Sequence, residues 1–223
     1  MIPKIIHYCW FGGKDLPNLA SRCIESWKRL LPDYEIKCWS EENFDIENSV
    51  PYLKEAYFTK KYAFVSDYVR LYVLYNEGGI YMDIDVEVIK DFSKLLGENA
   101  VLGYEDDNSL TTAFIAVPPK AIWIKQLLDL YEKRSFIREN EVLDLTTNVT
   151  FISNYLKEKG MTINGKYLKK DDIEIYPSEY FSPIDVITNK IEGVHSSRKE
   201  IGEALDILET QSNAKGKKQR FLS

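Results

Sequence analysis

The segment Tyr62–Ile89 constrains this chain more than any other, because it joins a buried helix to a strand that carries acidic residues. Its first half is apolar on most sides, which predicts a buried helix, yet it also carries Ser66, Asp67 and Arg70. Asp67 and Arg70 lie three positions apart, so on a helix they share one face. The pair Gly78-Gly79 predicts the left-handed cap that ends the helix.

After these glycines the apolar pattern changes to a period of two, which predicts one continuous strand from Ile80 to Val88. Tyr81, Asp83, Asp85 and Glu87 would then share one face of that strand. Buried carboxylates are costly unless they are paired or bound to a metal. An Asp-x-Asp pair in an otherwise apolar strand therefore favours a hard divalent cation with oxygen ligands.

The motif Ser-Asp-x-x-Arg, followed by Gly-Gly-x-Tyr-x-Asp-x-Asp, resembles the sugar-binding region of the DXD-motif glycosyltransferases. It is similar to the small capsule-type enzymes of glycosyltransferase family 32, which are related to the catalytic domains of clostridial glucosylating toxins. The segments 2–13 and 176–181 also resemble that family, and the three blocks occur in the family's order over roughly residues 1 to 185. The resemblance implies a GT-A-type nucleotide-binding fold and a hexosyltransferase that uses a nucleotide sugar, with a UDP-sugar as the expected donor.

The resemblance also implies roles for single residues. Asp67 and Arg70 would hold sugar hydroxyls, and Arg70 can also offset charge on the departing phosphate. Their alternative is an ion pair within the helix. Tyr81 matches the family's donor-site tyrosine, Trp10 would stack on the uracil ring, and Ser66 would contact the nucleotide.

A metal-bound diphosphate explains the acidic pair. Breaking the anomeric bond places charge on the leaving diphosphate, and Mn²⁺ or Mg²⁺ stabilises that charge as a Lewis acid. We expect Asp85 to bind the metal directly and Asp83 to reach it through water or to contact the ribose. His195 is a candidate third ligand, with a surface histidine as its alternative, and Asn148 lies near the sugar or caps a loop. The residues expected to be catalytic are Asp67, Arg70 and Asp85.

Apolar strands alternate with amphipathic helices along the rest of the chain, which predicts an α/β protein with a central, mostly parallel sheet flanked by helices. A strand at residues 4–10 ends in a glycine loop, and a helix and a second strand follow, which is the order of a parallel crossover. Later strands are expected at 100–104, 112–117 and 173–176, and later helices at 51–60, 122–131 and around 151–156. We assign residues 1–195 to one glycosyltransferase domain.

Residues 196–223 form a polar, atypical tail with one weak helix near 204–208. The family usually ends its catalytic domain with a histidine segment followed by Ser-Trp, whereas here Val194–Ser197 is followed by no tryptophan. We therefore expect the closing loop to be missing or rebuilt. Four basic residues of the tail could contact an anionic membrane, where a lipid-linked acceptor would lie. They are Lys215, Lys217, Lys218 and Arg220.

The composition of the chain limits the classes of binding partner and the compartment that we expect. A formal net charge of −6 argues against a nucleic-acid binder. Cys9, Cys23 and Cys38 lack metal-type spacing, which predicts reduced thiols of a cytosolic protein. Without a signal peptide or a long apolar run, we expect a cytoplasmic protein, with any membrane contact at the inner face. The expected partners are a nucleotide-sugar donor and a glycan or lipid-linked glycan acceptor.

Two other classes fit parts of the pattern. A haloacid dehalogenase-type phosphatase also uses an Asp-x-Asp, but its pair opens the chain at the end of the first strand, whereas Asp83 follows more than eighty residues. A non-catalytic sugar-binding module with the same fold would fit the unusual tail. His7 lies in the first strand, where a hydrogen-bonded core histidine is the simpler interpretation.

Overall fold

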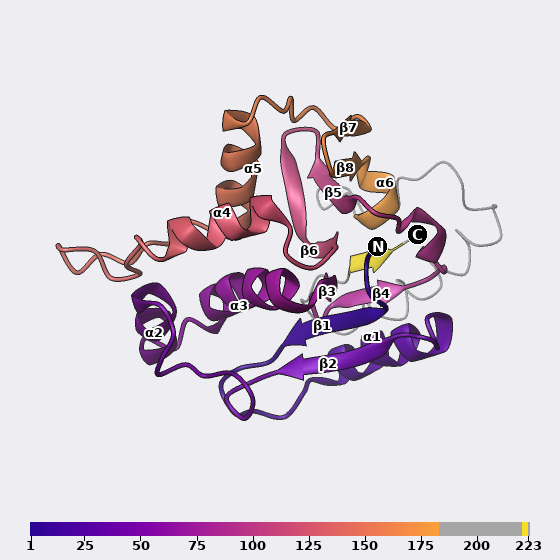
Figure 1. Cartoon of the computed structure of the whole chain (residues 1–223). Coiled ribbons are helices and arrows are strands. Elements are labelled where there is room, and N and C mark those ends of the chain that lie inside the picture. The colour runs from indigo at the N-terminus through magenta and orange to yellow at the C-terminus, as the bar shows by residue number, and fades with distance from the viewer. Residues whose placement is uncertain (183–219, 223) are drawn as a thin grey trace.

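The computed structural model describes residues 1–182 and the backbone of residues 220–222. Seven strands form the central sheet (Figure 1). They are β1 (Ile5–Cys9), β2 (Glu35–Trp39), β3 (Gly79–Met82), β5 (Ala100–Asp106), β6 (Ser109–Val117), β7 (Leu168–Lys170) and β8 (Ile173–Tyr176). Their order across the sheet is β2-β1-β3-β6-β5-β8-β7.

The strand directions confirm the predicted α/β class with a mostly parallel sheet. The pairs β1–β2, β1–β3 and β5–β8 are parallel, whereas β6 pairs antiparallel with β3 and β5, and β7 pairs antiparallel with β8. Five of the seven strands therefore run in one direction, and only β6 and β7 oppose them. The parallel strands of a sheet end at one common edge, which is where open α/β sheets bind ligands.

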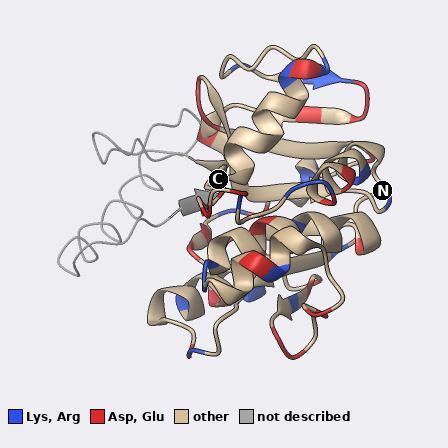
Figure 2. Ribbon diagram, turned by 90° about the vertical axis from the view of Figure 1, so that its left-hand side faces the viewer, with Lys and Arg blue, Asp and Glu red and all other residues tan. Residues whose placement is uncertain are grey.

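Helices cover both faces of this sheet, in three layers (Figure 1). The elements are α1 (Asn18–Leu30), α2 (Pro51–Phe58), α3 (Tyr62–Glu77), the short 3-10 helix η1 (Ser93–Leu95), α4 (Ile122–Tyr131), α5 (Asn148–Glu158) and α6 (Ser178–Phe181). One apolar core lies between the sheet and α2 to α5, and a second lies between the sheet and α1 and α6. Figure 2 shows the charged residues mainly on loops and helix surfaces, with the long strands largely uncharged.

The first strand, helix and second strand form the predicted parallel crossover, with Ile6 of β1 paired to Ile36 of β2. The expected helices at 51–60 and 122–131 and the strand at 173–176 are also present. Three details differ. Strand β6 begins at Ser109, earlier than predicted, because it forms a hairpin with β5. Strand β7 was not predicted. Leu130, which was expected on the apolar stripe of α4, is 41% exposed.

The prediction of one continuous strand from Ile80 to Val88 was wrong. Strand β3 ends at Met82, and a turn follows that is closed by a hydrogen bond from the Val86 amide to the Asp83 carbonyl, 3.1 Å long. The chain then forms a separate short strand, β4 (Val86–Val88). Asp83 and Asp85 therefore lie on a turn at the edge of the sheet and do not share the face of a strand with Tyr81.

Helix α1 explains why β4 leaves the sheet. The Trp27 indole N–H donates to the Val86 carbonyl over 2.7 Å, and the Val88 amide donates to Ser26 Oγ over 2.9 Å. Val86 and Val88 are buried in the core beneath α1. Trp27 and Ser26 of α1 thus make the backbone hydrogen bonds that a neighbouring strand would otherwise make. They hold the acidic turn at its C-terminal end, where β4 begins.

Strand β4 also pairs in parallel with β9 (Arg220–Leu222), which forms a second, two-stranded sheet that the sequence did not predict. The expected helix near 204–208, His195, and Lys215, Lys217 and Lys218 of the basic tail lie outside the described residues. Among the described residues, none of the helices is long and apolar enough to cross a membrane.

Buried polar residues of the first strand fit the core interpretation. His7 is fully buried, its Nδ1 accepts a hydrogen bond from the Trp39 indole over 3.1 Å, and its Nε2 lies 2.8 Å from the Gly78 carbonyl. The ring is therefore the neutral tautomer with the proton on Nε2, and burial lowers its pKa. Cys9 and Cys23 are buried and Cys38 is partly buried, all three as free thiols.

The turn from α3 into β3 depends on glycine. Gly79 has φ +101°, and a Cβ there would lie 2.6 Å from the Ile5 carbonyl oxygen of β1. Gly97 has open space around it and no positive φ. We predict that Gly79→Ala lowers the free energy of unfolding by on the order of 1–3 kcal/mol, whereas Gly97→Ala changes it little. Urea denaturation of both variants measures this, and equal effects would contradict the account of the turn.

Candidate donor-sugar and metal site

The predicted site residues gather where β1 and β3 end side by side. These strands are parallel neighbours, with His7 opposite Tyr81, so their carboxyl ends meet at one edge of the sheet. Trp10 directly follows β1, and Asp83 directly follows β3. Helix α3 packs on both strands and brings its own polar residues to the same place.

Arg70 of α3 is the centre of this arrangement. Its Nη2 lies 3.1 Å from Asp67 Oδ1 and 3.5 Å from Asp83 Oδ1, so one guanidinium joins a helix carboxylate to the acidic turn. Its Nη1 donates to the Thr112 carbonyl of β6 over 2.6 Å. The residue is only 5% exposed. A buried guanidinium stays charged, and here two carboxylates compensate that charge.

The two carboxylates differ in their surroundings. The side chain of Asp83 is 29% exposed, and its Oδ1 also accepts a hydrogen bond from the Tyr81 hydroxyl over 3.1 Å. Asp67 is buried, and burial raises its pKa to about 6 even though Arg70 opposes that rise. The site therefore combines one half-open acid on a turn with one enclosed acid on a helix.

Tyr81 and Ser66 both contact Arg70 and so help to hold the cluster of Asp67, Arg70 and Asp83. The Tyr81 ring is 2% exposed and lies 4.5 Å from the Arg70 guanidinium carbon, which is a cation–π contact. Ser66 donates its hydroxyl to the Tyr62 carbonyl one turn earlier, and its own carbonyl accepts from Arg70 Nε over 3.3 Å. Both residues therefore contact Arg70, while their predicted contacts with the donor stay predictions.

Asn148 is the first residue of α5 and is 1% exposed. Its backbone amide donates to Asp67 Oδ2 over 3.1 Å, and its Nδ2 donates to the Asp67 carbonyl over 2.7 Å. The start of α5 is thereby fastened to α3. These contacts join two helices, and α5 has no side-chain cap hydrogen bond, so neither the sugar contact nor the capping role that the sequence left open is decided.

Trp10 is partly buried at the tip of β1, and its indole N–H donates to the Lys14 carbonyl. The glycine loop that follows packs closely on the start of α3, since a Cβ on Gly12 would lie 2.6 Å from the Tyr62 ring. Gly12 has φ +100°, which favours glycine. The loop thus packs on the first turn of α3.

The donor set fits a hard cation only in part. Asp83 and Asp85 offer carboxylate oxygens on one turn, and hard cations take oxygen ligands. Within residues 1–182, no group of three or more His, Cys, Asp or Glu side chains is arranged to hold a metal. The predicted third ligand, His195, lies outside the described part of the chain. A metal here would need further oxygens, which a diphosphate and water can supply.

The sequence analysis missed several groups that contact Arg70 or Asn148 and so hold the Asp67–Arg70–Asp83 cluster in place. The Thr112 carbonyl carries no sequence signal. Tyr131 was expected only as an apolar residue of α4, but its hydroxyl donates to Asn148 Oδ1 over 2.7 Å. Arg134 packs on the Tyr131 ring and pairs with Asp144 over 2.9 Å. Because hydroxyl and guanidinium groups on an apolar stripe need buried partners, these two residues were the available clue.

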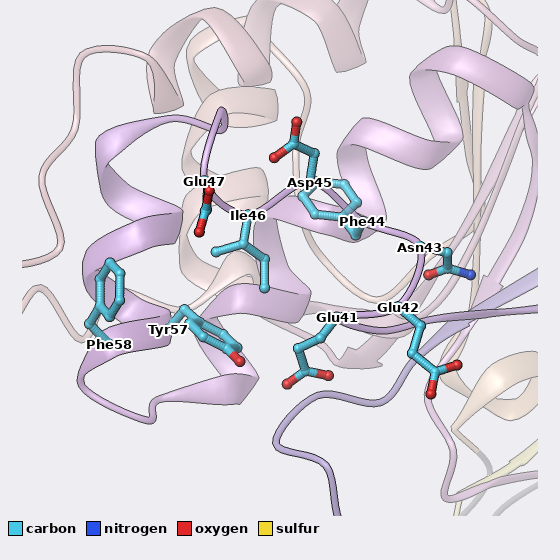
Figure 3. Close-up of a pocket in the computed structure, with 9 residues that line it drawn as sticks. All are labelled: Glu41, Glu42, Asn43, Phe44, Asp45, Ile46, Glu47, Tyr57 and Phe58. Atoms are coloured by element: carbon cyan, nitrogen blue, oxygen red, sulfur yellow. The ribbon is translucent and has the colours of Figure 1, made fainter.

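An acidic hollow lies beside the glycine loop. It has a volume of about 560 Å³ and lies between the loop after β2 and α2 (Figure 3). The Gly12 amide donates to Glu41 Oε1 over 2.6 Å, which ties this loop to the tip of β1. The hollow contains none of the predicted site residues. It is lined by Glu41, Glu42, Asn43, Phe44, Asp45, Ile46, Glu47, Tyr57 and Phe58.

Comparison with known families agrees with this geometry. Residues 17–102 match the family described as the glycosyltransferase sugar-binding region containing DXD motif. This region of the chain is therefore similar to the sugar-binding region of that family. It contains α3, β3 and the acidic turn, so the Asp67–Arg70–Asp83 cluster lies entirely within it.

Individual proteins are similar to this chain over more of its length than the family match. An uncharacterized glycosyltransferase of Acanthamoeba polyphaga mimivirus is 26% identical over 85% of this chain and 76% of its own length. The mannosyl phosphorylinositol ceramide synthase CSH1 of Saccharomyces cerevisiae is 26% identical over 82% of this chain, which spans 51% of that protein. The solved structure of the PaToxG glycosyltransferase superposes with a TM-score of 0.56 at 25% identity, over 71% of this chain and 70% of that one. The fold is of the GT-A type.

The Asp144 cluster allows a test of stability against pH. Burial would raise the pKa of Asp144, but hydrogen bonds from Thr146 and ion pairs with Arg134 lower it to about 2, from an ordinary value of 3.8. A depressed pKa stabilises the fold above pH 3.8, and this contribution is lost as pH falls toward 2.

We predict that Asp144→Asn lowers the urea midpoint at pH 7. The gap to the unmodified protein should shrink on acidification, by roughly half at pH 3. A gap that stays constant between pH 7 and pH 3 would show that the carboxylate charge does not contribute.

Proposed function

We propose that this chain is a metal-dependent glycosyltransferase that moves a hexose from a nucleotide sugar to a glycan acceptor. The observation that carries the proposal is the Arg70 cluster, which fixes the acidic turn to α3 at the edge where β1 and β3 end. The match of residues 17–102 to the DXD family supports the same activity. A UDP-hexose donor, retention of anomeric configuration and a role in capsule or related polysaccharide synthesis complete the proposal.

In this proposal Asp67, Arg70 and Trp10 act on different parts of the donor. Asp67, held by Arg70 and Asn148, accepts hydrogen bonds from hydroxyls of the donor sugar. Arg70 keeps Asp67 and Asp83 in place and adds positive charge near the departing diphosphate. Trp10, at the tip of β1, stacks on the nucleotide base.

Asp83 and Asp85 would hold Mn²⁺ or Mg²⁺, and the ion would stabilise the negative charge of the leaving diphosphate. We propose Asp85 as the direct ligand. Asp83, whose Oδ1 contacts Tyr81 and Arg70, would reach the ion through water or contact the ribose. His195 remains a proposed third ligand.

Retention of anomeric configuration fits a reaction in which the acceptor hydroxyl attacks the anomeric carbon from the same side as the departing diphosphate. The acceptor oxygen then forms the new bond to the anomeric carbon as the old carbon–oxygen bond breaks. The diphosphate departs with the bonding electron pair, and its oxygen can take the proton of the acceptor. A cytoplasmic site and contact of the basic tail with the inner face of a membrane are further proposals.

The test is release of nucleoside diphosphate from a panel of UDP- and GDP-sugars, with Mn²⁺ and water as acceptor. We predict that one UDP-hexose is hydrolysed, that EDTA stops the reaction, and that Asp85→Asn lowers the rate at least a hundredfold because it removes a metal ligand without changing the shape. Asp33→Asn, an exposed acid before β2, serves as the control and should keep full activity.

The outcomes separate the alternatives. Hydrolysis of GDP-mannose in place of a UDP-hexose would replace the proposed donor and bring the chain nearer in function to the mannosyl phosphorylinositol ceramide synthase CSH1. Binding without hydrolysis of any sugar nucleotide, in the presence of acceptor glycans, would favour the non-catalytic module. Full activity in excess EDTA would contradict the metal proposal.

A further inference from the structure

Asp67 is enclosed on two sides by groups of this chain. Its Oδ1 pairs with Arg70 over 3.1 Å, and its Oδ2 accepts the backbone amide of Asn148 over 3.1 Å. The side chain of Asn148 donates in addition to the Asp67 carbonyl over 2.7 Å. The first residue of α5 therefore sets the position of Asp67, both through its backbone and through its side chain.

The amide of Asn148 can face Asp67 in two ways, because its oxygen and nitrogen have nearly the same shape. The Asp67 carbonyl removes this choice because it can only accept, and it therefore requires Nδ2. The Tyr131 hydroxyl of α4 donates to the other end of the amide, Asn148 Oδ1, over 2.7 Å. A flipped amide would point its oxygen at the Asp67 carbonyl, where two acceptors repel each other. Tyr131 thus holds the oxygen end of the amide while Nδ2 donates to Asp67.

The hydroxyl of Tyr131 is itself fixed in position. The residue is fully buried, and its ring contacts Tyr52 and Phe151, each with ring centroids 4.9 Å away. The guanidinium of Arg134 lies 4.7 Å from the same ring and pairs with Asp144 over 2.9 Å. A ring packed against these groups cannot follow Asn148 if that side chain moves, so the hydroxyl acts as a fixed donor.

We infer that Tyr131 is a positioning residue for the donor sugar, acting on Asp67 through the side chain of Asn148. This inference rests on the proposed function, in which Asp67 binds sugar hydroxyls. The chain of contacts runs from α4 through the start of α5 to α3 and does not include the residues proposed for the base or the metal. Loss of the Tyr131 hydroxyl should therefore weaken recognition of the sugar and leave recognition of the nucleotide intact.

The test compares Tyr131→Phe with Tyr155→Phe. Tyr155 lies on α5, is buried, and donates its hydroxyl to Gln126, away from Asp67. Both variants lose one hydroxyl and one side-chain hydrogen bond. Calorimetry with Mn²⁺ measures the affinity for UDP and for the UDP-sugar identified in the panel, at a temperature where melting curves show both variants folded.

We predict that Tyr131→Phe weakens UDP-sugar binding about three- to tenfold, the range of one lost hydrogen bond. Its affinity for UDP and all affinities of Tyr155→Phe should stay unchanged. A Tyr131→Phe variant with a lowered melting temperature and an unaltered ratio of the two affinities would overturn the inference, because the hydroxyl would then serve stability alone.

Failure of the proposed function gives a different result. If the unmodified protein binds no UDP- or GDP-sugar under these conditions, the proposed function fails and the inference falls with it. If the unmodified protein binds a nucleotide sugar and Tyr131→Phe binds it equally well, only the inference fails.

Discussion

The structure around the site depends on compensating the charge of one buried arginine. Arg70 is enclosed by α3, β3 and β6, and it would be costly there without Asp67, Asp83 and the Thr112 carbonyl. Because these partners come from three elements, meeting the needs of one guanidinium also sets how α3, the end of β3 and β6 lie relative to each other. The polar site and the packing of the fold are therefore one arrangement at this edge of the sheet.

The acidic turn is held at both ends. Arg70 and Tyr81 hold Asp83 where β3 stops, and Trp27 and Ser26 of α1 hold the backbone of β4 on the other side. The turn between them carries Asp85, so the proposed metal ligand lies on a short, doubly anchored segment. Preorganised ligands of this kind suit a site that must stabilise charge on a leaving diphosphate.

Much of this could be predicted from the sequence. Helical spacing placed Asp67 and Arg70 on one face, and the alternation of strands and helices gave the sheet class. The period-two pattern failed from Asp83 onward because it cannot tell a sheet neighbour from side chains such as Trp27 and Ser26, which are distant in the sequence. For the same reason Tyr131 was indistinguishable from an apolar residue, since its partner Asn148 is on another helix.

The central claim is that Asp67, held by Arg70, binds the donor sugar, and that the pair is not merely an ion pair that stabilises α3. The most direct measurement is calorimetric affinity of Asp67→Asn for UDP and for the UDP-sugar, with a melting curve alongside. The account predicts nearly unchanged affinity for UDP and a loss of roughly ten- to a hundredfold for the UDP-sugar, as expected for a hydrogen bond to a charged group. A lowered melting temperature with an unaltered ratio of the two affinities would contradict it.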